Sequence, residues 1–356
     1  MSDFEAATQE DASRALDLPG LHDRELSPAD FYEDKRVTVL GATGLIGSYM
    51  VKWMHHLGAK VTAILGHERP PNDFTKMADV LGRFDLLHIE EAEKAVRGAE
   101  IVMDLAGVTG GVGMAMTDPT SFVALNAVLG ANILQACYLE HVGIVGFPSS
   151  TVVYQELNRP VREHDLNYAF NPYPLYYGIG WTKRYLEKLC RYYYDSVGMR
   201  IAIVRPSGAY GRYDNFDERT SHVLPGLIAR AARGEGPLVV WGDGKDVRDL
   251  VHASDIARGL LLAVMLKNDA DPINIASGRP VTTWELARMV LDAMGSKQGI
   301  EFDVSKPRAL QYRAVDITKA REILGYEPEV SLEEGIKDTV DWYRDLREYG
   351  GFWFAR

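Results

Sequence analysis

The sequence predicts an α/β protein built on a doubly wound parallel sheet, with a smaller lobe in its C-terminal half. Short apolar segments rich in β-branched residues alternate with segments of helical spacing from residue 36 to about residue 211. This alternation is typical of a parallel sheet with helices on both faces. The first apolar segment, VTVL at 37–40, leads directly into the glycine-rich turn GATGLIG at 41–47. A strand, a glycine turn and a helix in this order begin a doubly wound fold.

The remaining elements follow in a regular order. The strands are short and apolar, as in KVTAIL and EIVMDLAG, and the helices carry apolar residues three or four positions apart and end near a glycine. Strands are expected at 60–65, 100–107, 143–150 and 199–211, and helices at 48–59, 92–99, 119–141 and 181–198. After Gly211 the alternation loosens into a mixed region with a join at 306–308, and a last amphipathic helix is expected at 332–349.

These elements suggest three parts of the chain. We expect an acidic leader at 1–34, a Rossmann-type domain at 35–211 and a mainly substrate-binding lobe at 212–356. The chain is expected to return to the Rossmann-type domain around 239–280.

Composition places the protein among ordinary globular chains. It has 356 residues, 46% hydrophobic and 25% charged, which allows one large domain, alone or with a smaller partner. Cys137 and Cys190 are too few for a disulfide framework and lie outside any C-x-x-C pair, so no metal site is expected. The first residues lack an apolar segment, and the longest apolar stretch, 259–266, is too short to span a membrane. The sequence therefore predicts a cytoplasmic protein.

Charge is concentrated at the N-terminus. The net charge is −11, which argues against general binding to nucleic acid. Residues 1–34 hold ten acidic and two basic side chains, so the rest of the chain is nearly balanced. The leader is interpreted either as a solvated segment or as an arm that covers a subunit interface or the mouth of the active site.

The glycine turn is the first candidate for a binding site. A glycine turn that opens a helix directs backbone N–H groups and the helix N-terminus at a pyrophosphate. The spacing G-x-x-G-x-x-G therefore predicts that a nicotinamide dinucleotide is bound by Gly41, Thr43, Gly44, Leu45, Ile46 and Gly47.

The choice between NAD and NADP stays open at the end of the second strand. A carboxylate usually binds the adenosine ribose there, but Leu65 is followed by Gly66, His67, Glu68 and Arg69. Glu68 can accept a hydrogen bond from a 2′-hydroxyl, whereas Arg69 can neutralise a 2′-phosphate. We expect NAD and do not exclude NADP.

From residue 36 to about 347 the chain resembles the extended short-chain dehydrogenases that act on nucleotide sugars, such as UDP-glucose 4-epimerase, GDP-mannose 3,5-epimerase and GDP-fucose synthase. The resemblance implies an adenine contact at Asp85 and Leu86, and a nicotinamide ribose contact at Leu105, Ala106 and Gly107. Asn126, VRPS at 204–207, SHVLP at 221–225, VVWGDG at 239–244 and AVDITKAREILGYEP at 314–328 also match the family. The Gly110-Gly111 pair points to a guanine nucleotide.

The catalytic residues of the family are present with one exception. The resemblance assigns the catalytic hydroxyl to Ser150, with Thr151 as the alternative, and the catalytic lysine to Lys183. The lysine lowers the pKa of a tyrosine that lies four residues before it in the family. Ile179 holds that position here. Tyr177 is our preferred substitute, Tyr176 needs a kink to reach the site, and a third reading has no tyrosine in the role.

Missing residues narrow the reaction. Thr151 and Val152 follow Ser150, where the family's dehydratases have an Asp-Glu pair and where its 3,5-epimerases have a cysteine two residues on. Hydride transfer at a single carbinol is what remains. The resemblance further implies that a GDP- or UDP-linked sugar is bound by Gly111, Arg212, His222, Arg248 and Arg313.

We therefore predict a nucleotide-sugar epimerase that works by transient oxidation at C4. A nucleotide-sugar ketoreductase or decarboxylase is the alternative enzyme, and a catalytically silent, dinucleotide-sensing binding protein is the alternative of another class. The resemblance also implies a homodimer through a four-helix contact.

Overall fold

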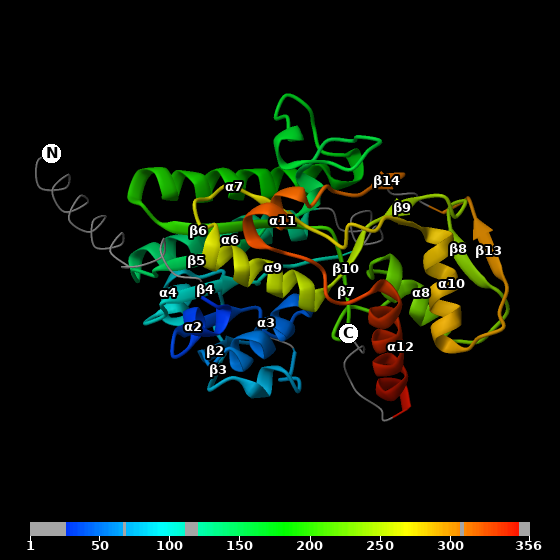
Figure 1. Cartoon of the computed structure of the whole chain (residues 1–356), viewed down its shortest axis with the longest axis horizontal. Helices are drawn as coiled ribbons and strands as arrows, with labels where there is room; N and C mark the ends of the chain where they lie inside the picture. The colour runs from blue at the N-terminus through cyan, green and yellow to red at the C-terminus, as the bar shows by residue number, and fades with distance from the viewer. Residues whose placement is uncertain (1–25, 67–68, 111–119, 307–309, 349–356) are drawn as a thin grey trace, which may run out of the picture.

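A seven-stranded parallel sheet forms the larger part of the molecule (Figure 1). The computed structural model describes residues 26–66, 69–110, 120–306 and 310–348. The sheet runs in the order β11-β6-β5-β4-β1-β2-β3, so the direction of winding reverses between β1 and β4. The strands are β1 (Arg36–Leu40), β2 (Lys60–Ile64), β3 (Val80–Gly82), β4 (Ile101–Asp104), β5 (Ile144–Pro148), β6 (Arg200–Pro206) and β11 (Ile273–Ile275). This topology confirms the predicted doubly wound parallel sheet.

Helices cover both faces of the sheet (Figure 1). One face carries α2 (Pro28–Tyr32), α3 (Leu45–His56), α9 (Ala253–Leu266) and α11 (Thr318–Leu324); the other carries α4 (Ile89–Val96), α6 (Ser121–Leu139) and α7 (Tyr177–Val197). Side chains alternate between the two apolar cores: Met103 of β4 belongs to the core under α3 and α9, and Val102 to the core under α6 and α7. Each strand is therefore buried on both sides, as parallel strands usually are.

The smaller lobe has its own apolar core. β8 (Leu238–Trp241) pairs in parallel with β13 (Ile300–Asp303), and α8 (Val223–Ala231), α10 (Thr283–Met294) and α12 (Leu332–Glu348) pack around this core. Two short sheets connect the lobe to the large sheet. They contain β7 (Gly208–Tyr210) with β10 (Leu250–His252), and β9 (Val247–Arg248) with β12 (Val281–Thr282) and β14 (Tyr312–Arg313).

Some element bounds differ from the sequence-based expectation. The segment 199–211 forms two strands, β6 and β7, which separate at Ser207, where the chain leaves the large sheet for the lobe. Helix α7 begins at Tyr177, four residues before its expected start. Single turns of 3-10 helix lie at η1 (Thr75–Met77), η2 (Thr151–Val153), η3 (Glu163–Asp165) and η4 (Pro174–Tyr176).

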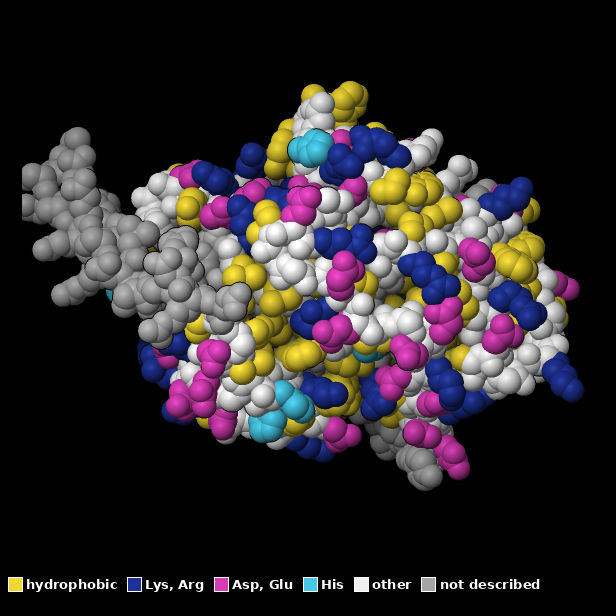
Figure 2. Space-filling model, viewed as in Figure 1, with side chains coloured by type: hydrophobic (Ala, Val, Ile, Leu, Met, Phe, Trp, Pro, Cys, Tyr) yellow, Lys and Arg dark blue, Asp and Glu magenta, His cyan; other side chains and the backbone are white. Residues whose placement is uncertain are grey.

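Other sequence-based expectations bear on the described residues only in part. Most of the acidic leader and part of the 306–308 join lie outside them. Within the described ranges, no helix is long and apolar enough to cross a membrane. The same ranges hold no cluster of His, Cys, Asp and Glu that could bind a metal ion. Figure 2 shows acidic and basic side chains interspersed over one face of the molecule.

Candidate active site

The glycine turn brings two parts of the backbone into contact at the end of β1. Gly41 has a φ of 67°, a conformation that glycine adopts without strain. A Cβ atom at Gly41 would lie 2.8 Å from the Cα atom of Ala106, and one at Gly47 would lie 2.9 Å from the carbonyl carbon of Gly41. Side chains are therefore excluded at both positions. The turn keeps the start of α3 close to the ends of β1 and β4.

The N-terminus of α3 opens into a cavity of about 430 Å³ between the sheet and the lobe. Gly44 is the N-cap residue of α3, and it has no side chain that could form a capping hydrogen bond. The first backbone N–H groups of a helix have no partner within the helix, so they suit a phosphate group. Of the predicted phosphate residues, Gly44, Leu45, Ile46 and Gly47 line the cavity, whereas Gly41 and Thr43 do not.

The end of β2, where the sequence predicts contacts to the adenosine ribose, lies next to Thr43. The Thr43 hydroxyl accepts a hydrogen bond from the Gly66 N–H at 3.1 Å, and the Thr43 carbonyl accepts one from Arg69 at 3.5 Å. Arg83, which sequence reasoning missed, donates to the carbonyl oxygens of Gly66 and Arg69. Two guanidinium groups are thus held around the end of β2. His67 and Glu68 lie outside the described residues.

Asp85 and Leu86 follow β3 but do not line the cavity. Asp85 accepts hydrogen bonds from the Leu87 N–H at 3.1 Å and pairs with the His88 ring at 3.0 Å. Leu86 is buried, and its carbonyl oxygen accepts a hydrogen bond from Asn132 of α6. Both residues therefore fix the loop before α4.

The loop after β4 forms the floor of the cavity. Leu105, Ala106 and Gly107, for which the resemblance implies a ribose contact, all line it. Asn126 of α6 holds the loop, because its side chain accepts a hydrogen bond from the Val108 N–H at 3.1 Å and donates one to the Val108 carbonyl at 2.8 Å. Gly111 lies outside the described residues.

Ser150 and Lys183 lie in the same cavity. The Lys183 ammonium donates a hydrogen bond to the Pro148 carbonyl at 2.9 Å and lies 4.8 Å from the centre of the Phe147 ring. Burial lowers the pKa of Lys183 from its ordinary value, and the nearby Asp104 carboxylate opposes that shift. The Ser150 hydroxyl accepts a hydrogen bond from the Val152 N–H. Ser149, which sequence reasoning did not single out, also lines the cavity, and its buried hydroxyl has no hydrogen-bond partner within the described part of the chain.

The tyrosines are arranged differently from the preferred reading. Tyr177, our substitute for the family tyrosine, has 52% of its surface exposed and does not line the cavity. Tyr176 lines it, together with Ile179 and Lys183. Ile179 and Lys183 are one helical turn apart, so isoleucine occupies the place from which a family tyrosine would reach the site.

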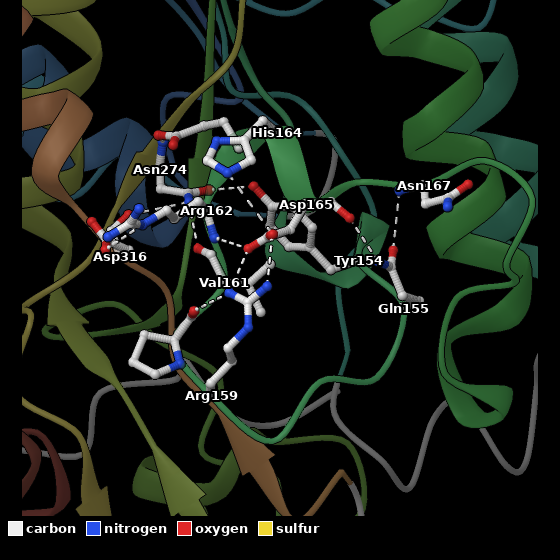
Figure 3. Close-up of polar contacts among 12 residues, drawn as sticks. Tyr154, Gln155, Arg159, Val161, Arg162, His164, Asp165, Asn167, Asn274 and Asp316 are labelled. Atoms are coloured by element: carbon white, nitrogen blue, oxygen red, sulfur yellow. Dashed lines mark hydrogen bonds and ion pairs between the residues drawn. The ribbon is translucent and has the colours of Figure 1, made fainter.

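A polar network holds the segment that follows Ser150 and Thr151 (Figure 3). The Tyr154 hydroxyl donates a hydrogen bond to Asn274 at 2.7 Å, and Asn274 donates to the carbonyl oxygen of Val161 at 2.9 Å. Arg159 forms two hydrogen bonds to Asp165, both 2.7 Å long. These contacts fix the chain just beyond Ser150 against β11.

Thr151, the alternative catalytic hydroxyl, points toward the lobe. Its hydroxyl accepts two hydrogen bonds from Arg313, at 3.2 and 3.0 Å, and it does not line the cavity. The Arg313 guanidinium also lies 5.2 Å from the centre of the Tyr176 ring. Arg313 therefore links Thr151, just after β5, to the lobe.

The lobe contributes basic side chains to the cavity. Three residues for which the resemblance implies substrate binding, Arg248, Arg313 and His222, line it. Arg212 does not line it; its guanidinium is paired with Asp338 of α12, with one hydrogen bond of 2.8 Å. Arg230, which sequence reasoning missed, lines the cavity, and its buried Nε atom has no hydrogen-bond partner in the described ranges.

This cavity fits a nicotinamide dinucleotide. The glycine cradle at its sheet side excludes side chains where a pyrophosphate would lie, and a helix N-terminus faces it. Ser150, just after β5, and Lys183, on α7, line the same cavity. The basic side chains of the lobe, Arg230, Arg248 and Arg313, extend the site toward a second anionic group.

Known proteins share both the sequence and the fold. Residues 37–276 match the NAD-dependent epimerase/dehydratase family. The chain is 30% identical over 332 residues to dTDP-4-dehydro-6-deoxy-D-allose reductase of a Streptomyces species, covering 89% of this chain and 98% of that protein. It is 30% identical to GDP-L-fucose synthase 1 of Arabidopsis thaliana, covering 86% and 93%.

A solved structure extends this similarity to three dimensions. UDP-glucose 4-epimerase of Thermotoga maritima with UDP-glucose is 25% identical, with a TM-score of 0.78 over 88% of this chain and 99% of that chain. The chain therefore belongs to the NAD-dependent epimerase/dehydratase family, the extended short-chain dehydrogenases that act on nucleotide sugars, and its cofactor is NAD or NADP.

Proposed function

We propose that the protein catalyses hydride transfer at a single carbon of a nucleotide sugar. The observation that carries this proposal is one cavity that joins the phosphate turn, Lys183, Ser150 and the arginines of the lobe. When bound, the nicotinamide ring accepts or returns a hydride. A sugar between Ser150 and that ring, with its diphosphate at Arg248 and Arg313, would fill the cavity from the sheet to the lobe.

Each residue then has a role set by its position. Lys183, held at the Pro148 carbonyl, would bind the nicotinamide ribose through its ammonium group. The Ser150 hydroxyl would orient the reacting oxygen of the sugar. Tyr176 is our proposed proton donor and acceptor, because it lines the cavity whereas Tyr177 is exposed outside it.

Two other reactions of the family have no support in these side chains. Val152 lines the cavity two residues after Ser150, at the position of the cysteine in the family's 3,5-epimerases. The aliphatic side chain of Val152 cannot exchange a proton with a sugar carbon. The dehydratase pair is replaced by Thr151, which bonds Arg313, and by Val152.

The direction of the chemistry separates two candidates. We favour reduction of a 4-ketone, because Arg69 and Arg83 around Gly66 suit the 2′-phosphate of NADPH. A relative that matches nearly the whole chain is named a dTDP-sugar reductase. The C4 epimerase favoured by the sequence is the second candidate, supported by the structural similarity to UDP-glucose 4-epimerase. An epimerase regenerates its bound cofactor in every turnover, whereas a reductase oxidises one reduced cofactor for each ketone that it reduces.

The test uses the purified full chain with dTDP-, GDP- and UDP-linked 4-keto sugars and the corresponding 4-hydroxy sugars. Stoichiometric loss of NADPH absorbance with a 4-keto sugar is the expected result. Interconversion of 4-hydroxy sugars without net loss of reduced cofactor would favour the epimerase. Cofactor binding without redox change or product on any of these sugars would overturn both and favour the silent binding protein.

We also propose a homodimer that packs through α6 and α7. Val128 of α6 and Tyr185 and Tyr192 of α7 are exposed large apolar side chains on these neighbouring helices, and exposed apolar patches often mark interfaces. Light scattering of the native chain and of Tyr192→Glu tests this, since the charged variant should be monomeric. A native monomer would contradict it. The cytoplasmic location stays a prediction.

A further inference from the structure

Asp104 is a buried carboxylic acid to which the proposed function assigns no role. It ends β4, directly before Leu105 in the floor of the cavity, and only 3% of its surface is exposed. One oxygen accepts a hydrogen bond from the Ala106 backbone, and Oδ1 has no hydrogen-bond partner among the residues that the structure describes. The cation that acts on its carboxylate is the Lys183 ammonium. Burying a carboxyl group with an unpaired oxygen costs free energy, so such a group calls for an explanation.

The strand register directs Asp104 toward Lys183. Met103 pairs with Gly146, so Asp104 lies beside Phe147 on the neighbouring strand. Val102 and Phe147 face the core under α6 and α7, and Asp104 faces the same side because strand side chains alternate. Lys183 descends from α7 onto this spot, where its ammonium lies over the Phe147 ring.

Few other groups that can change charge lie near Asp104. Cys137 from α6 and Cys190 from α7 interact with it, but burial raises the pKa of both thiols, so they stay neutral. Glu187 of α7 is held by Arg205 of β6 in two hydrogen bonds of 2.9 and 2.7 Å. On the adjoining strands, β1 ends in Leu40 and β5 in Pro148, which carry no charge. Asp104 and Lys183 are therefore the pair that responds to a new charge in the cavity.

We propose that Asp104 is a positioning residue that acts through Lys183: it is ionised when the oxidised cofactor is bound and protonated when the reduced cofactor is bound. The charge beside Lys183 would then follow the oxidation state of the nicotinamide ring. This inference rests on the proposed function, which places the ring and its ribose at Lys183.

The physical reason is the balance of charge at the strand ends. Burial raises the pKa of Asp104 to about 7, and the Lys183 ammonium opposes the rise. The oxidised ring is positive, so it repels the ammonium and favours the ionised carboxylate, whereas the reduced ring is neutral. Binding of the oxidised cofactor would break the O–H bond of Asp104 and release its proton to solvent. A lower pH should therefore weaken binding of the oxidised form alone.

The test is the dissociation constant of each cofactor form at pH 6 and pH 8, measured by calorimetry without substrate. In the native protein, the affinity for the oxidised form relative to the reduced form should rise by about threefold or more across this range. Asp104→Asn should remove that rise. Asp73→Asn, which changes an exposed carboxylate paired with Lys76, is the control and should keep it.

Infrared difference spectroscopy gives a second reading that does not depend on the variant folding. Adding oxidised cofactor to the native protein near pH 7 should remove a protonated carboxyl band, and adding reduced cofactor should leave it. A native affinity ratio that does not change with pH, or a band that both forms leave in place, would overturn the inference. Neither measurement needs turnover, so an inactive protein with the expected pH dependence would refute the proposed function and not the role of Asp104.

Discussion

Gly47 packs directly against the carbonyl group of Gly41, leaving no room for a side chain: a Cβ atom there would lie 2.9 Å from the Gly41 carbonyl carbon and closer still to its oxygen. This contact sets the distance between the start of α3 and the end of β1. The cofactor site of the family depends on that distance, since the helix N-terminus must reach the pyrophosphate.

Gly47→Ala should therefore weaken cofactor binding, because the added methyl group pushes α3 away from the turn. We expect at least a tenfold rise in the dissociation constant of the reduced cofactor, or about 1.4 kcal/mol, measured by fluorescence titration. Gly299→Ala is the control, since a Cβ atom there would meet only Pro237 at 3.9 Å. Native affinity in a folded Gly47→Ala protein would contradict the phosphate assignment.

The proton donor can be identified with two tyrosine variants. Tyr176→Phe should lower turnover by a factor of about 100 or more, the usual scale of positioned acid–base catalysis, with substrate affinity nearly unchanged. Tyr177→Phe should retain turnover, because its side chain is exposed outside the cavity. The opposite pattern would restore Tyr177, the choice made from the sequence.

Ile179→Tyr extends the same test. The new phenol would lie one turn before Lys183, on the cavity side of α7. A rise in turnover would indicate that the native site is an altered form of the common one. If turnover falls while cofactor binding is unchanged, Ile179 leaves space that the substrate needs.

Local pattern predicted most of the sheet but not its weakest strands. β1, β2, β4 and β5 are apolar and buried, so their composition reveals them. β3 has only the three residues Val80–Gly82, which are too few to show a strand pattern, and Val80 and Leu81 are exposed. β11 is recognised only through its pairing with β6, about 70 residues earlier in the chain.

The site was predictable where function depends on one segment. The glycine turn and Lys183 can each be recognised from the spacing of neighbouring residues in the sequence. Arg212 was chosen as a substrate residue, and its partner Asp338 lies 126 positions away on α12, beyond any local signal. Tyr176 and Tyr177 differ only in where α7 begins, and helix starts are among the least certain features of a sequence.

Arg248 is expected to bind the diphosphate of the substrate. Its side chain lines the cavity, and one guanidinium group can donate two parallel hydrogen bonds to the oxygens of a phosphate. Arg248→Ala should weaken binding of a nucleotide sugar by about tenfold or more, or about 1.4 kcal/mol, in calorimetry with the cofactor present. Cofactor affinity should not change.

Arg212→Ala is the matched control, because that guanidinium is paired with Asp338 and does not line the cavity. Equal loss of substrate affinity in both variants would contradict the assignment of Arg248. Thermal melting of both proteins checks that the loss is not one of folding, since Arg248 also donates to the carbonyl oxygens of Val247 and Leu310.

The Arg159–Asp165 contact should make stability depend on pH in the acidic range. Hydrogen bonds from Arg159 lower the pKa of Asp165 from 3.8 to about 2 (Figure 3). A carboxyl group with a lowered pKa stabilises the folded state above its unfolded pKa, and this contribution is lost as pH falls through the folded pKa. The free energy of unfolding of the native protein should therefore exceed that of Asp165→Asn near pH 6, and the difference should shrink between about pH 4 and pH 2.

Denaturant titrations across this range measure the difference, and Arg159→Met should reproduce the behaviour of Asp165→Asn because it removes the largest cause of the pKa shift. A constant difference at every pH would mean that Asp165 acts through its shape and backbone contacts and not through its charge.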